Sequence, residues 1–279
     1  MHEMKELHKI IEREVELRNR EPGQLNVDHV DESGEVIAGD GIDCSECLNK
    51  GFLFAVVDDV SVGSTMVVRP CKCAKQRALV RRIRESGLAD KLDDYTFENF
   101  DAVEPWQQAM VVTSKRYLSD GIGDGHWLYL GGQSGSGKTH IATAVVGQMI
   151  STMDVLCVTW PKMAQRLKAA AMDGPVYASE IQPLQEAGLL LIDDFFKPTR
   201  SDGSLSVSGA DVRLAFDIID SRYLSEKPTI ISSEWFLTEL IDIDEAVGGR
   251  IFDKCHKYTV NVRRDKARNH RYHYADAVV

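Results

Sequence analysis

The large C-terminal part of the chain alternates between two hydrophobic patterns. Five short runs are rich in apolar residues: 126–130, 155–159, 189–192, 229–232 and 258–262. Runs of this length, bounded by polar residues, favour buried strands. Between them apolar residues recur with helical spacing near 105–119, 138–151, 161–171, 209–224 and 244–255. Strands that alternate with helices predict an α/β fold with a largely parallel sheet.

The first 93 residues follow a different pattern. Four apolar residues with helical spacing among charges predict an amphipathic helix over 4–18: Met4, Leu7, Ile11 and Val15. Residues 22–43 are rich in Gly, Asp and Glu, which predicts a loop, and a further helix is expected over 75–91. The change in pattern predicts a small N-terminal module over 1–93 and one larger domain over 94–279.

A glycine-rich sequence follows the first apolar run of the large domain. It matches the P-loop pattern G-x-x-x-x-G-K-[ST] at every fixed position: Gly132, Gln133, Ser134, Gly135, Ser136, Gly137, Lys138 and Thr139. Such glycines let backbone N–H groups face phosphate oxygens, the lysine adds a positive charge, and the threonine hydroxyl is a ligand for Mg²⁺. A chance match is disfavoured by the flanking strand and helix patterns. These eight residues are therefore the predicted ATP site.

The apolar run 189–192 ends in two adjacent acids, Asp193 and Asp194. P-loop enzymes hold Mg²⁺ with a second carboxylate at the end of a neighbouring buried strand. We expect Asp193, with Thr139, to lie on the metal side and Asp194 to orient or deprotonate the attacking water. The alternative is a solvated turn. Together with Lys138, the two acids are the predicted catalytic residues of ATP hydrolysis.

The order of these motifs resembles that of the AAA+ ATPases of the DnaC, DnaI and IstB group, in particular the bacterial and phage helicase loaders. The resemblance covers about residues 94–275 and also rests on 95–100, 191–197, 228–234, 248–251 and 269–271. It implies that Arg250 is an arginine finger, which reaches the γ-phosphate bound by a neighbouring subunit. It also implies that Arg271 contacts the nucleotide in its own subunit, with Arg268 as the alternative.

Two positions depart from the pattern of this group. The sensor 1 position, often Asn in the group, is Glu234 here with Ser233 beside it, so either residue could hold the water, or neither. Many AAA+ proteins carry Asp-Glu where this chain has Asp193-Asp194. The shorter second acid predicts slow hydrolysis, which suits a timed switch better than a fast motor.

Four of the six cysteines form two close pairs, Cys44-x2-Cys47 and Cys71-x-Cys73, with 23 residues between them. Two such pairs can surround one tetrahedral Zn²⁺ and leave no open position for water, so a structural zinc site is predicted. A redox C-x-x-C is the alternative, but the thioredoxin-like βαβ context that it needs is absent. The isolated Cys157 and Cys255 are expected to be packed in the interior.

Composition and charge limit the classes of partner. The chain is 43% apolar and 27% charged, which is typical of a globular protein, and its net charge of −10 excludes a uniform coat of nucleic-acid-binding charge. Basic residues are concentrated in 69–84, with seven and no acid, and in 256–273, with six against one acid. The first stretch could contact phosphates or an acidic partner, or form a solvated helix face. No apolar run reaches the roughly 18 residues of a membrane span, so a cytoplasmic location and no membrane partner are expected.

These features predict an ATP-dependent helicase loader that uses ATP, Mg²⁺ and Zn²⁺. Its N-terminal module would dock on a replicative DNA helicase, and its AAA+ domain would assemble as a homo-oligomer. The resemblance further implies contacts with single-stranded DNA by Lys162, Arg166 and Lys168. The alternative is an IstB-like transposition ATPase that acts on duplex DNA and a transposase, and the zinc module favours the loader. A small-molecule kinase would leave Arg250 and the cysteines unexplained.

Overall fold

A computed structural model describes residues 29–30, 36–37, 44–59, 63–75, 77, 94–149, 152–201 and 204–272. The chain divides into two compact units, Met1–Arg81 and Arg82–Val279. The helix predicted over 4–18 and most of that predicted over 75–91 lie outside the described residues, and so does the boundary predicted at 93/94, which stays a prediction. Within the described ranges, every helix is too short or too polar to cross a membrane.

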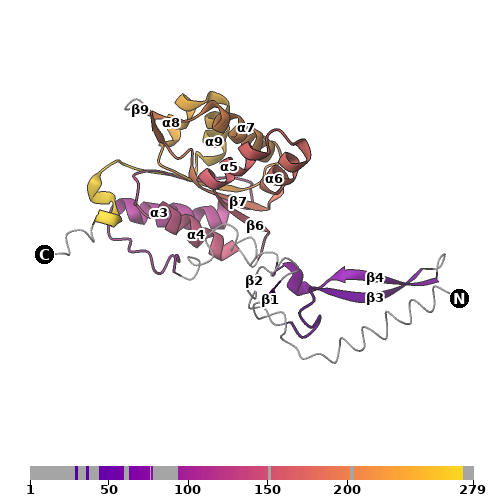
Figure 1. Cartoon of the computed structure of the whole chain (residues 1–279). Coiled ribbons are helices and arrows are strands. Elements are labelled where there is room, and N and C mark those ends of the chain that lie inside the picture. The colour runs from indigo at the N-terminus through magenta and orange to yellow at the C-terminus, as the bar shows by residue number, and fades with distance from the viewer. Residues whose placement is uncertain are drawn as a thin grey trace. The chain divides into compact units, whose positions relative to one another are not determined.

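The second unit is built on a five-stranded sheet (Figure 1). In the order in which they lie across the sheet, its strands are β11 (Thr259–Val262), β5 (Leu128–Gly132), β10 (Thr229–Ser233), β7 (Leu189–Phe195) and β6 (Val155–Thr159). Every neighbouring pair is parallel. All residues of β5 and β10 are buried, as in a parallel sheet that is covered on both faces, and β10 also buries the hydroxyls of Thr229, Ser232 and Ser233. The predicted α/β class with a largely parallel sheet is confirmed.

Helices cover both faces of the sheet. Figure 1 shows α3 (Pro105–Arg116) and α4 (Lys138–Met149) together on one face. The other face carries α5 (Trp160–Ala170), α6 (Gly174–Glu186), α7 (Gly209–Leu224), α8 (Leu237–Ile243) and α9 (Glu245–Cys255). A π-helical turn, Tyr117–Gly121, extends α3, and a short antiparallel pair, β8 (Thr199–Ser201) and β9 (Ser204–Ser206), precedes α7. Two 3-10 turns, Lys266–Arg268 and His270–Tyr272, follow β11.

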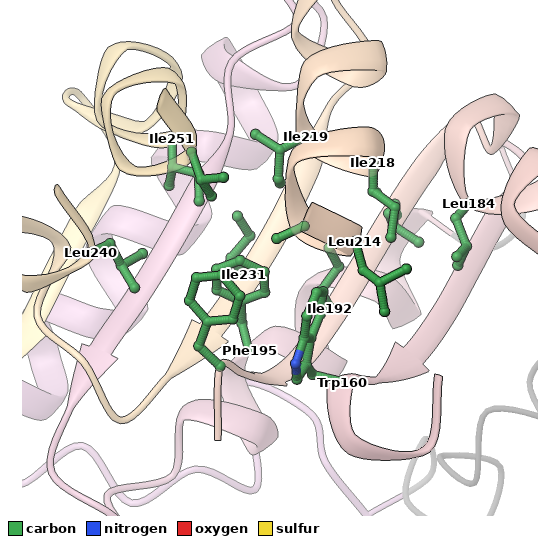
Figure 2. Packing of buried hydrophobic residues seen from close by; sticks show 14 of the residues in the cluster. Trp160, Leu184, Ile192, Phe195, Leu214, Ile218, Ile219, Ile231, Leu240 and Ile251 are labelled. Carbon is green, nitrogen blue, oxygen red and sulfur yellow. The ribbon is translucent and has the colours of Figure 1, made fainter. Parts of the chain in front are cut away.

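The main hydrophobic core lies between the sheet and the second group of helices. Figure 2 shows Ile192, Phe195 and Ile231 of the sheet packed beneath Leu214 of α7 and Ile251 of α9. These five side chains are at most 7% exposed. Because the core fixes the carboxyl ends of β7 and β10, it also fixes the polar residues that follow there.

The first unit contains an antiparallel hairpin of β3 (Phe52–Asp59) and β4 (Gly63–Pro70), in register from Phe52–Pro70 to Asp59–Gly63. The sequence pattern did not predict this hairpin. A short antiparallel pair, β1 (His29–Val30) and β2 (Val36–Ile37), lies within the stretch that was expected to be a loop. One cysteine pair precedes β3 and the other follows β4, so the hairpin returns the chain to its starting point and joins the two pairs.

Candidate functional site

The P-loop connects β5 to α4 and has a conformation that requires glycine. Gly132, Gly135 and Gly137 have φ angles of 97°, 71° and 86°, in the left-handed region that side chains disfavour. Space is limited as well. A Cβ atom on Gly135 would lie 1.9 Å from Asn269 Oδ1, and one on Gly137 would lie 2.6 Å from the ring of Phe100.

Lys138 begins α4 and directs its ammonium group back into the loop. Its Nζ donates hydrogen bonds to the carbonyl oxygens of Gly132 at 2.9 Å and Gln133 at 2.6 Å. Burial lowers the pKa of Lys138 to about 8, and nearby acids, Glu234 first, oppose that shift. The cation is thus held among neutral carbonyl groups, in position to exchange them for phosphate oxygens.

The P-loop meets the end of β7 through a hydrogen bond. Thr139 Oγ1 donates to Asp193 at 3.0 Å and 3.1 Å from its two carboxylate oxygens, and the Ser232 hydroxyl donates to the same carboxylate. Burial raises the pKa of Asp193, although the hydrogen bonds from Ser232 and Thr139 limit the rise. The structure therefore brings together the hydroxyl and carboxylate predicted to hold magnesium, and both are ligand types that Mg²⁺ prefers.

Asp194 and Glu234 lie on the next positions toward solvent. Lys197 Nζ bridges them, at 3.2 Å from Asp194 Oδ1 and 2.6 Å from Glu234 Oε1. Ser233 instead points into the interior, where its hydroxyl donates to the carbonyl oxygen of Phe195 at 2.7 Å. Of the two sensor 1 candidates, only Glu234 faces the site. Lys197 ends the 191–197 segment that shares the family resemblance, but the sequence analysis gave it no role.

A cleft of about 360 Å³ opens beside the P-loop. Besides the P-loop, its walls come from Tyr95, residues 99–101, His140, Asp194, Lys197, Glu234, His270 and Arg271. The 95–101 segment is held by aromatic contacts, because the Tyr95 ring stacks on His140 of α4 at 4.6 Å between centroids. The segment was noted only for its resemblance to the family, so these wall residues are a second feature that the motifs did not reveal.

The three candidate arginines lie in different places. Arg271 lines the cleft, whereas Arg268 lies over the ring of Trp106, 5.8 Å from its centroid, and does not line it. Arg250 on α9 pairs with Asp220 at 2.7 Å and lies 5.0 Å from the ring centroid of Phe216. It is not among the described residues that line the cleft of its own chain.

The four paired cysteines form a compact, buried cluster. The Sγ atoms of Cys44 and Cys71 are 3.7 Å apart, those of Cys47 and Cys73 are 3.4 Å apart, and all four lie within 4.8 Å of one another. Zn–S bonds of about 2.3 Å in a tetrahedron put sulfurs about 3.8 Å apart. The backbone N–H of Gly51 also donates to Cys47 Sγ at 3.3 Å. The four thiols therefore fit a metal ion such as zinc.

The other two cysteines do not belong to the four-cysteine cluster. Cys157 and Cys255 are both buried, and neither is bonded to another cysteine.

The candidate DNA contacts lie on α5. Arg166 is paired with Glu180 at 2.6 Å and Lys168 with Asp211 at 2.8 Å. Lys162 is exposed on α5. Residues 78–84 of the first basic stretch lie outside the described residues.

The chain matches a known protein family over most of its length. The pattern of the IstB-like ATP binding protein family matches residues 65–273. The uncharacterized protein YqaM of Bacillus subtilis (strain 168) is 28% identical over 250 residues, which cover 87% of this chain and 79% of that protein.

Two solved structures are similar in fold. The DnaC helicase loader superposes with a TM-score of 0.51 and 18% identity, over 63% of this chain and 100% of that one. The replication initiator DnaA bound to AMPPCP and single-stranded DNA superposes with a TM-score of 0.50 and 22% identity, over 62% of this chain but only 50% of that one. At these identities the likeness shows the fold alone. With three quarters of its length matched, the chain belongs to the IstB-like ATP-binding protein family, and its second unit has the AAA+ fold.

Proposed function

We propose that the chain is an ATP hydrolase whose cleft binds the Mg²⁺ complex of ATP. The observation that carries this proposal is the Thr139–Asp193 hydrogen bond, which puts the two metal-side residues in contact at the mouth of the P-loop. Lys138 and the loop N–H groups would bind the β- and γ-phosphates, and Mg²⁺ would neutralise charge on them. Asp194, next along β7, would orient or deprotonate the attacking water.

The two arginines would act from different subunits. Arg271 lines the cleft and would contact the nucleotide in its own chain. Arg250 lies outside that cleft, on the surface of α9, as a residue that serves a neighbouring copy must. The Asp220 carboxylate and the Phe216 ring hold its guanidinium in place before assembly. We expect a homo-oligomer and, because Asp194 has the shorter side chain, slow turnover.

Phosphate release by purified variants tests this assignment. Lys138→Ala should lose nucleotide binding, whereas Arg250→Ala should bind nucleotide normally and lose hydrolysis by about 10³-fold, the usual effect of an arginine finger. Mixing Arg250→Ala with Lys138→Ala chains should restore part of the activity, because each supplies what the other lacks. Equal loss of binding in both variants would remove Arg250 from this role. A turnover of many ATP per second per subunit would contradict the slow-switch assignment.

We further propose that the ATPase is a helicase loader, which places a replicative DNA helicase on single-stranded DNA. Its support is the AAA+ fold shared with the DnaC helicase loader and with DnaA bound to single-stranded DNA, together with the four-cysteine cluster ahead of the ATPase unit. The N-terminal module would dock on the helicase, and Lys162, Arg166 and Lys168 are the proposed DNA contacts. The family match is equally compatible with a transposition ATPase that acts on a transposase and duplex DNA.

A pull-down of the full chain separates these two functions. The replicative helicase and the transposase of the source organism are each tested with ATP and with ADP. ATP-dependent association with the helicase, and preference for single-stranded over duplex DNA, support the loader. Association with the transposase and duplex DNA supports the alternative, and failure to bind the helicase in either nucleotide state contradicts the loader.

A further inference from the structure

A cation lies between two carboxylates at the phosphate end of the cleft. Lys197 Nζ is 2.6 Å from Glu234 and 3.2 Å from Asp194. All three side chains line the cleft together with Lys138 and Thr139 of the P-loop. A surface ion pair elsewhere would be unremarkable, but this one faces the place where phosphates must lie.

Glu234 by itself would oppose a bound nucleotide. Its side chain is only 24% exposed, so water screens its charge poorly, and like charges in such a cleft repel one another. Burial alone would raise the pKa of Glu234. The hydrogen bond and charge of Lys197, with help from Ser134 and Lys138, outweigh burial and hold that pKa below its usual value. Glu234 is therefore ionised, and Lys197 is its nearest compensating charge.

The backbone fixes Lys197 in this position. Asp194 and Phe196 have φ angles of 54° and 50°, which are uncommon for residues other than glycine. The Lys197 N–H donates to the Asp194 carbonyl oxygen at 3.0 Å, which closes a tight turn.

Core packing holds that turn. The Phe196 ring is 1% exposed and stacks on Phe195 at 4.1 Å between centroids. The indole N–H of Trp235 donates to the Phe196 carbonyl oxygen at 2.8 Å. Strained backbone that is held by its surroundings is characteristic of functional sites. The turn directs the Lys197 ammonium toward the two acids, although the side chain stays 40% exposed.

We propose that Lys197 is a specificity-determining residue that allows this cleft to accept a nucleoside triphosphate. It neutralises Glu234 when the γ-phosphate position is empty, and it donates to the γ-phosphate when a triphosphate is bound. A diphosphate ends before this position, so its binding depends little on Lys197. This inference rests on the proposed ATP hydrolysis and deepens it, because it names the residue by which the cleft distinguishes ATP from ADP.

The test measures dissociation constants of the full-length chain for Mg²⁺-AMPPNP and for Mg²⁺-ADP by isothermal titration calorimetry. Lys197→Met removes the nearest compensating charge of Glu234, so AMPPNP should bind about 10- to 100-fold more weakly and ADP within about 3-fold of wild type, as expected for loss of a charged hydrogen bond. The double variant Lys197→Met, Glu234→Gln should regain most of the AMPPNP affinity, because the unpaired charge is gone. Lys197→Arg should retain the AMPPNP affinity. The matched control is Lys257→Met, which removes an exposed lysine outside the cleft and should leave both affinities unchanged.

Each outcome decides the proposal. Selective loss of AMPPNP binding with rescue by Glu234→Gln supports it. Equal weakening of AMPPNP and ADP, absence of rescue, or a Lys197→Met variant that binds like wild type overturns it while leaving ATP hydrolysis intact. A wild-type chain that binds neither nucleotide overturns both this inference and the proposed function. Thermal unfolding of each variant confirms that the fold is retained.

Discussion

Removal of one cysteine from the four-cysteine cluster should release its metal and unfold the cluster region. The change is Cys73→Ser, since the Cys73 side chain is 2% exposed and its sulfur lies 3.4 Å from that of Cys47. A serine hydroxyl does not replace a thiolate as a zinc ligand. We expect the wild-type chain to contain one zinc ion and the variant to contain almost none.

The expected size of the effect follows from what else is buried there. Among the described residues of this unit, the buried apolar cluster consists of the four cysteines, with Leu53 partly buried against it. Burial of one leucine contributes about 1.5–3 kcal/mol. Zinc binding contributes roughly 10–16 kcal/mol to folding in small zinc modules. The metal should therefore be the main source of stability, and the region should not stay folded without it.

Elemental analysis of the purified chain and limited proteolysis measure the two consequences. Cys73→Ser, like wild type treated with a strong chelator, should be cleaved within residues 44–75, while the ATPase unit stays resistant. The matched control is Cys157→Ser, which alters a buried cysteine of β6 outside the cluster and should leave the zinc content unchanged. A full zinc content in Cys73→Ser, or a protease-resistant 44–75 region after chelation, would refute this reasoning.

Three further changes test single features of the ATPase unit. The guanidinium of Arg222 is fully buried and donates to Thr229 and to the carbonyls of Ala187 and Pro228. Arg222→Met should therefore lower the free energy of unfolding by about 3 kcal/mol and the Tm by about 6–12 °C. An unchanged Tm would contradict this. Gly135 has a φ of 71°, and a Cβ there would clash with Asn269, so Gly135→Ala should lower the free energy of unfolding by about 1–2 kcal/mol and weaken ATP binding. The control Gly147→Ala, in open space on α4, should neither destabilise the chain nor weaken ATP binding. Glu239→Gln should lower Tm by about 2–4 °C at pH 7. The hydrogen bonds from Arg264 hold the pKa of Glu239 below its ordinary 4.5, so this stabilisation is lost as the pH falls, and the Tm difference should close in acid rather than persist.

The sequence predicted most closely those helices and strands whose boundaries are set by neighbouring residues in the chain. The helix expected over 209–224 is α7, Gly209–Leu224, because the Ser208 hydroxyl accepts from the Asp211 N–H and defines its start. The strand expected over 126–130 is found at Leu128–Gly132 instead. Its last residue, Gly132, pairs with Val262 of β11, and such partnering from a distant strand overrides the poor strand propensity of glycine.

Other elements carry misleading local signals. Helix α6 contains Gly174 and Pro183, which both disfavour a helix, yet Asp173 caps it, Pro175 suits its first turn, and its Ile181 and Leu184 pack into the core. Tertiary burial outweighs those propensities. The segments that form β3 and β4 are apolar over much of their length and lie only three residues apart, but residues 60–62, Val-Ser-Val, contain neither Gly nor Asn, the strongest sequence signals of a hairpin turn.

The candidate site, too, contains some residues that the local sequence predicts and others that only the structure reveals. Each motif residue lies in a short, recognisable sequence, so the P-loop and Asp193 could be predicted directly. Ser233 is the last residue of the wholly buried strand β10 and Glu234 follows it, and only the structure shows that Glu234 lines the cleft while Ser233 points into the interior. Lys197 joins Glu234 because β7 and β10 are neighbours in a sheet whose order does not follow the chain. Asn269 meets Gly135 across more than 130 residues for the same reason.

The central claim is that the cleft beside residues 132–139 is the ATP site. A crystal structure of the full chain with Mg²⁺ and AMPPNP tests it most directly. We predict one nucleotide in the cleft, with its phosphates against the loop N–H groups and Lys138, and Mg²⁺ beside Thr139 and Asp193. An empty cleft at saturating nucleotide, or a nucleotide bound elsewhere on the chain, would contradict the claim.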